Sequence, residues 1–343
     1  MNRIFTRMAL VGAALAACAA AHAQDFLFPL KTVTVLAPSD NGGVVDKTAN
    51  LLVQGISQVT KKSVVLQSVR GEAPMVSAVL SLSKAKPDGY TVLLTSYEMS
   101  QAVKKDPEAS KALAQFEPVT AIASTASLFV TGGSQPYRNL KDFMAAAREK
   151  PGQLKCATAA PPSSSAIVGA DFDKKYPGLV KFVNYPHISQ AVASVVSGKS
   201  DCMFELPYPL MSHLLKGQLK SMAVTSSSRM LETPRTPTFL EASGEGFVSS
   251  SWYGVHAPKG TPSMVIRRIA QGVSMALSRE EILKSFGDMG YGVLSMDAEE
   301  FRRSIENDLG AARAIAFTPH SKPGASFSYA FQYPNAPKSA GLF

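Results

Sequence analysis

The sequence lacks most of the features that would place the protein in a membrane, on a nucleic acid or around a metal ion. Beyond residue 23 it contains no apolar run long enough to span a bilayer as a helix. Its basic residues form no cluster interleaved with aromatic side chains, which argues against nucleic-acid binding even at a net charge of +9. Its five His and three Cys show no metal-ligand spacing. No metal site and no cofactor are therefore expected.

A catalytic motif is also missing. There is no Gly-x-Ser-x-Gly elbow, and the His residues are dispersed along the chain. Ser163 and His187 could meet as a nucleophile and a base, but no third residue is evident to orient the base. We therefore expect a protein that is not an enzyme, with an exported Ser-dependent hydrolase as the alternative from a different class. Ligand-dependent closure without turnover would separate the two.

What the sequence does contain is typical of a globular protein with two domains. At 343 residues the chain can bury two cores, and 45% of its residues are hydrophobic while 18% are charged. The net positive charge suits an anionic ligand, but many exported proteins are basic, so it is weak evidence.

Residues 1–23 are predicted to be a signal peptide. Arg3 and Arg7 precede an apolar run over residues 8–21, and small residues occupy the cleavage positions before Gln24. The alternative is a lipoprotein box ending at Cys18, which would leave that residue lipidated. Either way the protein is expected to be exported to the periplasm.

The segment 87–96 is the clearest local pattern. Pro87-Asp88-Gly89 predicts a tight turn, and the uninterrupted apolar run 90–94 predicts a strand buried on both faces of a parallel sheet. Thr95 and Ser96 then place two hydroxyls at the carboxyl end of the strand, which is where open α/β sheets bind ligands.

This strand completes a β-α-β-α-β unit, which predicts a parallel sheet. The expected strands are 32–37, 64–66 and 90–94, and the expected helices are 46–59 and 74–84. Two short strands are expected next, at 119–123 and 127–131. The same layout then returns, with expected strands at 154–157, 180–185 and 202–205 that each end in a polar loop.

The repetition predicts an α/β fold with two lobes that face each other. Each lobe is expected to be a mostly parallel sheet flanked by helices, with a ligand cleft between the lobes. Residues 28–126 with 253–318 form the expected first lobe, and residues 127–252 form the second. The hinge is expected near residues 124–128 and 251–253.

The last 25 residues, 319–343, are expected to be an addition to this scaffold. Phe327, Tyr329, Phe331 and Tyr333 alternate with small or polar residues, a strand-like period of two. Such a row of aromatic side chains is expected to cover an apolar surface, with a disordered tail as the alternative.

Two cysteines lie near the middle of expected strands of the second lobe. The usual winding places the strands of Cys156 and Cys202 side by side, so the two residues are expected to be neighbours. Export permits a disulfide, although a bridge between adjacent strands strains the preferred geometry, so the bond itself is left open.

Several short motifs, taken together and in order, resemble the substrate-binding receptors of tripartite tricarboxylate transporters, the Bug-type periplasmic proteins. The resemblance covers residues 28–314. It rests on Lys86-Pro87-Asp88-Gly89-Tyr90-Thr91-Val92-Leu93-Leu94, Phe116-Glu117-Pro118-Val119, Leu140-Lys141-Asp142-Phe143, Lys150-Pro151-Gly152, Ala223-Val224-Thr225, residues 234–237, Ser251-Trp252-Tyr253-Gly254 and residues 257–262.

The resemblance implies a receptor of the two-lobe periplasmic binding protein fold, which closes on a small carboxylate and delivers it to a membrane permease. Aromatic acids and dicarboxylates are among the ligands considered, and the protein is expected to be a monomer. The ligand loops depart from the family pattern. Ser39-Asp40-Asn41 replace the usual aromatic and proline residues, Pro161-Pro162 replaces an Asn-Gly-like pair, His187-Ile188 replaces two glycines, and Glu205 occupies a usual Asp position. A non-carboxylate or zwitterionic ligand is therefore kept as the alternative.

The expected ligand contacts combine loop and strand-exit residues of both lobes. Arg70 could bind a carboxylate with its forked guanidinium, and Tyr97 and Tyr208 could flank a flat ligand. The full expected set is Ser39, Asp40, Asn41, Gly42, Gly43, Arg70, Thr95, Ser96, Tyr97, Thr158, Ser163, Ser164, His187, Glu205 and Tyr208.

Overall fold

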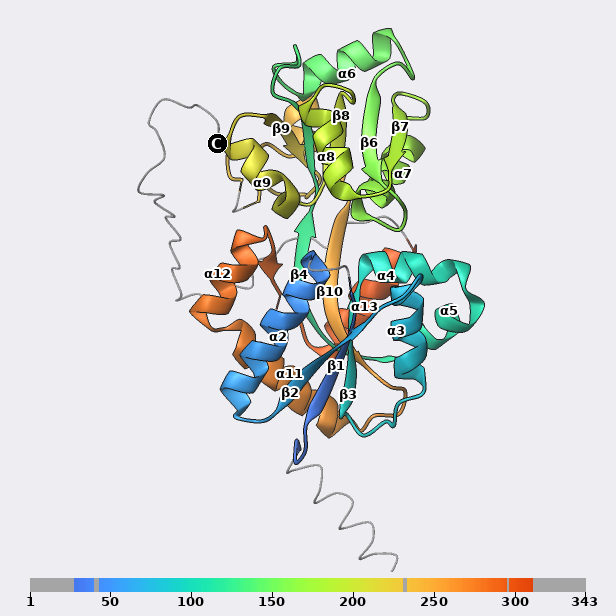
Figure 1. The fold of residues 1–343 in the computed structure, drawn as a ribbon, viewed down its shortest axis with the longest axis vertical. Helices are drawn as coiled ribbons and strands as arrows, with labels where there is room; N and C mark the ends of the chain where they lie inside the picture. The colour runs from blue at the N-terminus through green and yellow to red at the C-terminus, as the bar shows by residue number, and fades with distance from the viewer. Residues whose placement is uncertain (1–27, 40–42, 231–232, 295, 311–343) are drawn as a thin grey trace, which may run out of the picture.

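A computed structural model describes residues 28–39, 43–230, 233–294 and 296–310 of the protein. The expected signal segment with Cys18, the loop residues Asp40, Asn41 and Gly42, and the C-terminal segment 319–343 lie outside the described residues. The described chain forms two lobes, one above the other in Figure 1, each built around one sheet.

The sheet of lobe 1 has six strands in the order β11-β4-β10-β3-β1-β2. Strands β1, β2 and β3 are parallel, as the sequence predicts, while β10 runs antiparallel to both β3 and β4. The strand bounds are β1 Val33–Pro38, β2 Val64–Val69, β3 Thr91–Ser96, β4 Glu117–Ala126, β10 Ser250–Ala257 and β11 Gly292–Val293.

The sheet of lobe 2 has five strands in the order β7-β6-β8-β5-β9. Strands β6, β7 and β8 are parallel, and β5 runs antiparallel to β8 and β9. The bounds are β5 Leu128–Gly132, β6 Lys155–Ala159, β7 Lys181–Tyr185, β8 Cys202–Glu205 and β9 Leu219–Val224.

Helices cover both faces of each sheet, which confirms the predicted α/β class (Figure 1). The sheets themselves are mixed rather than mostly parallel as predicted, because the strands β4, β5 and β10 next to the crossings between the lobes pair in antiparallel fashion. On lobe 1 they are α2 Val44–Thr60, α3 Pro74–Ser83, α4 Tyr97–Ala102, α5 Pro107–Leu113, α11 Ser263–Leu277, α12 Glu280–Asp288 and α13 Ala298–Gly310, with a short 3-10 turn at Val103–Lys105. On lobe 2 they are α6 Leu140–Glu149, α7 Ser164–Lys175, α8 Ile188–Val196, α9 Pro207–Leu215 and α10 Phe239–Ser243.

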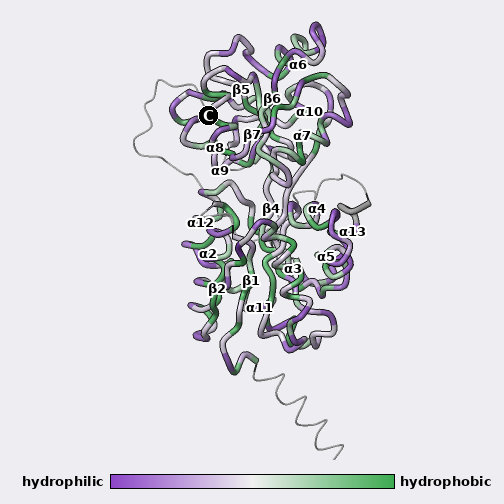
Figure 2. Tube along the Cα trace, turned by 45° about the vertical axis from the view of Figure 1, so that its right-hand side comes forward, coloured by the Kyte–Doolittle hydropathy of each residue, from purple (hydrophilic) through white to green (hydrophobic). Residues whose placement is uncertain are grey.

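The strands alternate between two cores, because successive side chains of a strand point to opposite faces of the sheet. Val33, Val35 and Ala37 of β1 pack with α2, α11 and α12, while Leu36 packs with α3, α4 and α5. Both faces are apolar, which explains why the sequence shows continuous hydrophobic runs at these strands rather than alternation. Figure 2 shows this distribution, with hydrophobic positions on the strands and many hydrophilic ones on the outer turns.

The chain crosses between the lobes twice. Strand β4 leads from lobe 1 into lobe 2, where β5 begins after the single residue Ser127. The return runs from β9 to β10, and the amide of Ser249 still bonds the carbonyl of Thr225 in lobe 2 before β10 begins. The two crossing segments lie side by side at the hinge, since Ser250 pairs with Ala126.

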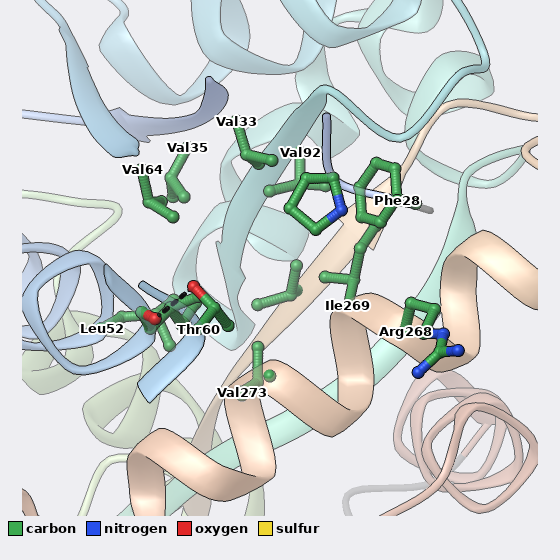
Figure 3. A pocket seen from close by; sticks show the side chains of 14 residues that line it. Phe28, Val33, Val35, Leu52, Thr60, Val64, Val92, Arg268, Ile269 and Val273 are labelled. Carbon is green, nitrogen blue, oxygen red and sulfur yellow. Dashed lines mark hydrogen bonds between the residues drawn. The ribbon is translucent and has the colours of Figure 1, made fainter. Parts of the chain in front are cut away.

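A small apolar hollow, partly open to solvent, lies between the lobe 1 sheet and helices α2 and α11 (Figure 3). Its walls are mainly aliphatic core residues, among them Val35, Leu52, Val92 and Val273. The hydroxyl of Thr60 on its wall is bonded to the carbonyl of Ile56. Apart from Thr60 and Arg268, the side chains that line the hollow are apolar, so it is mainly a gap in core packing.

Two glycines where α2 meets α11 provide a matched pair of stability tests. A Cβ on Gly272 would lie 3.4 Å from Cγ2 of Thr60, an ordinary contact at the wall of the hollow, whereas a Cβ on Gly55 would lie only 2.9 Å from Cβ of Ala276. Gly272→Ala is expected to raise the free energy of unfolding by about 0.5–1 kcal/mol, because alanine restricts the unfolded chain. Gly55→Ala should lower it by about 1–3 kcal/mol through overpacking. Urea unfolding measures both, and equal changes in the two variants would contradict the packing described.

Candidate ligand site

The carboxyl ends of the parallel strands of both lobes face each other across the hinge (Figure 1). In lobe 1, Ser96 at the end of β3 pairs with Tyr253 near the start of β10, and in lobe 2 Glu205 at the end of β8 pairs with Leu128 at the start of β5. Helices α2, α4, α7, α8 and α9 are the next elements after such strand ends, some directly and some after a short loop, so their N-termini lie on the same side of each sheet. Helix N-termini favour negative charge because their first amides lack intrahelical acceptors.

The first-lobe loop after β1 is described only at its two ends. The hydroxyl of Ser39 donates to Oδ2 of Asp46 at 3.0 Å, and Gly43 is the N-cap of α2 in an extended conformation. Arg70, which follows β2, is exposed, and β2 pairs with β1 along its length. These residues lie at the same edge of the sheet, as the sequence predicts for strands that run in parallel.

The two hydroxyls at the end of β3 are bonded within the protein. Oγ1 of Thr95 lies 3.1 Å from the carbonyl oxygen of Gly254 and 2.8 Å from Nδ1 of His256. Burial, with a smaller effect from Arg302, lowers the pKa of His256 to about 3, so its ring is neutral. Ser96 caps α4 by accepting a hydrogen bond from the amide of Met99 at 3.2 Å. Both side chains are at most 5% exposed.

The serines before α7 hold the loop of lobe 2 in place. Ser163 caps the helix by accepting from the amide of Ala166 at 3.3 Å, and its own hydroxyl donates to the carbonyl of Ala159 at 2.9 Å. Ser164 donates to Oε1 of Glu205 at 2.9 Å. The hydroxyl of Thr158 is bonded to Oδ1 of Asn184, an exposed residue of β7 that is not in the expected set.

Glu205 is buried at the end of β8 and has no ion-pair partner among the described residues. Its Oε1 also accepts from the amide of Leu206 at 2.8 Å, which begins the turn into α9. Burial raises the pKa of Glu205 to about 7, although the hydrogen bonds from Leu206 and Ser164 oppose that rise. At neutral pH this carboxyl is therefore poised between its charged and neutral forms.

Glu98, in the first turn of α4 on the other lobe, is near enough to Glu205 to act on the pKa of that carboxyl, and it is absent from the expected set. Its Oε1 accepts from the hydroxyl of Ser251 at 2.6 Å, and burial raises the pKa of the carboxyl. The negative charge of Glu98 contributes to the raised pKa of Glu205. The sequence contained a signal, since Glu98 follows the polar strand exit at Ser96 by two positions.

The remaining predicted contacts are placed in three different environments. Tyr208 packs against the core of lobe 1, with Nζ of Lys47 at 4.0 Å from the centre of its ring. Tyr97 is half-buried and packs beside the cluster of Trp252 and Phe301. His187 is exposed as the N-cap of α8. Within the described part of the chain, no hydrogen bond joins His187 to Ser163.

The turn from β8 into α9 is a contact between the lobes. A Cβ on Gly290 of lobe 1 would lie 2.6 Å from Cβ of Pro207, so only glycine permits this approach. The carbonyl of Gly290 accepts from Oγ1 of Thr125 at 2.7 Å on the hinge strand β4. Glu205, Pro207 and Tyr208 of one turn thus reach the other lobe together.

Cys156 and Cys202 form a disulfide, with their Cα atoms 4.5 Å apart. They are directly opposite each other on the neighbouring parallel strands β6 and β8, and both are fully buried. The predicted proximity is confirmed, and the bond that the sequence left open is present.

Two other features are absent from the described residues. No group of three or more His, Cys, Asp or Glu side chains there could hold a metal ion. Across the same residues, no helix is both long enough and apolar enough to cross a membrane.

Comparison with known proteins gives one family. The sequence model described as "Tripartite tricarboxylate transporter family receptor" matches residues 49–317. Among curated proteins, the chain is similar to the "UPF0065 protein in tcbD-tcbE intergenic region" of Pseudomonas sp. (strain P51). The two are 28% identical over 294 residues, a match that covers 84% of this chain and 87% of that protein.

Two solved structures of Rhodopseudomonas palustris proteins share the fold. MatC with bound malate is 23% identical, with a TM-score of 0.69 over 82% of this chain and 98% of that one. Rpa4515 with adipate is 22% identical, with a TM-score of 0.70 over 82% of this chain and 95% of that one. At these identities the likeness shows the two-lobe fold.

Proposed function

Because this chain belongs to the receptor family of tripartite tricarboxylate transporters, we propose that it binds a small carboxylate between its lobes and delivers it to a membrane permease. A solute receptor needs two surfaces that can close on one ligand, and the strand ends of the two sheets supply them. The observation that carries the proposal is that these ends, with five helix N-termini behind them, face each other at the hinge. The expected export signal would place this receptor in the periplasm.

The choice of a carboxylate rests on charge and on the structural neighbours. Helix N-termini present amide donors and a partial positive charge, which suits an anion. Arg70 is exposed and follows β2. It lies at the same edge of the sheet as the loop after β1, of which Ser39 and Gly43 are the two ends. The neighbours in the same fold hold malate and adipate, so we propose an aliphatic dicarboxylate of similar size as the ligand.

The expected residues divide into two groups in this proposal. Ser39, Gly43, Arg70, Ser164 and His187 keep partial or full exposure on the facing loops, and we propose that they contact the ligand directly. The buried residues, including Thr95, Ser96 and Thr158, hold the loops in place through their hydrogen bonds. Asp40, Asn41 and Gly42 belong to the ligand loop by their position in the sequence.

A thermal-shift screen tests this function. Malate, adipate and aromatic monocarboxylates are each added to the protein, with the uncharged diols of matching length as controls. A carboxylate at 100 times its Kd should stabilise the protein by about 2.7 kcal/mol, because it binds only the folded state. A shift of a few degrees with a carboxylate and none with its diol is expected. Equal shifts with acids and diols, or none with any acid, would contradict carboxylate binding.

A further inference from the structure

Two buried carboxyl groups from opposite lobes flank the hinge. Glu205 ends β8 opposite Leu128, the first residue of β5. Glu98 follows Ser96, which pairs with Tyr253 of β10. Glu205 is 4% exposed and Glu98 is 7% exposed, so neither has the water that would stabilise a negative charge.

The hydrogen bonds of the pair are incomplete for two ionised carboxylates, each of which can accept about four. Glu205 accepts from Ser164 and Leu206 through the same oxygen, Oε1. Glu98 accepts from Ser251 through Oε1, while its Oε2 is buried and has no hydrogen-bond partner among the described residues. Two ionised carboxylates in these positions would be strongly destabilised, so the pair is expected to hold at least one proton.

No cationic group compensates the pair in the part of the chain described. The elements packed on Glu205 present Leu128 from β5, the hydroxyls of Ser164 and Ser165 from α7, and Glu98 from α4. The elements around Glu98 present the hydroxyls of Ser96 and Ser251. The ammonium of Lys47, which reaches lobe 2 nearby, lies over the ring of Tyr208.

A carboxylate ligand would bring a further negative charge to this end of the cleft. An ionised Glu205 would repel it, whereas a neutral Glu205 keeps Oε1 as the acceptor of its two hydrogen bonds and can donate a proton from Oε2. Burial favours that neutral form of Glu205, negative charge on Glu98 favours it further, and the pKa of Glu205 is raised to about 7.

We propose that Glu205 is a neutral acid opposite Glu98 in the ligand-bound form, so that, at a pH where the free protein has lost this proton, closure on a carboxylate takes one proton up from solvent. The inference rests on the proposed function and adds its dependence on pH. The proton binds an oxygen of Glu205, and no other bond is formed or broken. Affinity should then fall about tenfold for each pH unit above pH 8.

The protonation itself is tested without ligand, by urea unfolding of the full chain between pH 5 and pH 8. The native form binds the Glu205 proton more tightly than the unfolded form, so this contribution to stability is complete below about pH 4.5 and is lost as the pH rises to about 7. Relative to Glu205→Gln, the unfolding constant of the natural protein should rise about tenfold per pH unit over that window. Glu149→Gln, an exposed carboxyl of the same lobe, is the control and should show no such trend.

Two results obtained without ligand decide whether folded Glu205 holds a proton. Glu98→Gln removes the facing charge, so the pH dependence should persist with its upper limit shifted to lower pH. A constant difference in stability between the natural protein and Glu205→Gln from pH 5 to pH 8 would overturn the inference.

Calorimetry with malate and adipate as probes tests the coupling to binding. The binding enthalpy is measured at pH 8 in two buffers that differ in ionisation enthalpy. The difference between the two enthalpies gives the number of protons exchanged, and it should correspond to nearly one proton taken up per ligand bound. Glu205→Gln should bind with no uptake and with little pH dependence. The inference would be overturned if the natural protein bound a probe without taking up a proton. It would also be overturned if binding released a proton. Absence of binding by both probes would count against the proposed function, and the ligand-free result would still decide the protonation.

Discussion

Replacing both Cys156 and Cys202 by Ala is expected to lower the free energy of unfolding by about 4 kcal/mol, from the loop-entropy relation for a crosslink that closes 46 residues. The two strands are already joined by the sheet, so the disulfide acts mainly by restricting the unfolded chain. Alanine is chosen because both side chains are fully buried and a serine hydroxyl there would lack water.

Urea unfolding with and without a reducing agent measures this effect. The natural protein should lose most of the same stability on reduction, whereas the Ala pair should be insensitive to the reductant. Equal stability of the oxidised and reduced natural protein would show that the disulfide constrains nothing.

Phe129→Ala is expected to lower the free energy of unfolding by about 3–5 kcal/mol, because it leaves a cavity in a packed aromatic core. Phe129 of β5 is fully buried, and its ring centre lies 4.9 Å from that of Phe143 on α6 and 4.8 Å from that of Phe204 on β8. The ring of Phe239 completes the contact at 5.8 Å. Phe129 therefore packs β5 against helices α6 and α10.

The matched control is Leu240→Ala in the same lobe, where the side chain is 61% exposed. That change should alter stability by no more than about 0.5 kcal/mol. Denaturant titration of the two variants separates them, and a loss below about 1.5 kcal/mol for Phe129→Ala would mean that the core readily closes the gap.

The strands were predictable because a strand buried on both faces of a sheet has a continuous run of hydrophobic residues. The apolar run 90–94 and the turn at Pro87-Asp88-Gly89 locate β3 to within two residues. The short helices α4, α5 and α9 were not predicted, since helices of fewer than three turns carry little periodicity. Their lengths are set by packing on the sheets, which the local sequence does not record.

The site was less predictable than the fold, because a hydroxyl at a strand end does not reveal its hydrogen-bond partner. Thr95 is bonded to His256, which lies 161 positions further along the chain. Glu98 looked like an ordinary charged residue of a first helical turn, and only the packing of α4 against β10 shows that it is buried. The approach of Pro207 to Gly290 likewise depends on how the lobes meet.

Small-angle X-ray scattering with and without a stabilising dicarboxylate tests the central claim, a two-lobe receptor that closes on its ligand, most directly. A ligand that contacts both lobes only in the closed form shifts the protein from the open toward the closed conformation. We expect the radius of gyration to decrease when malate or adipate is added at saturation, and to stay unchanged with the matching diol. A dicarboxylate that raises the melting temperature but leaves the scattering curve unaltered would contradict closure.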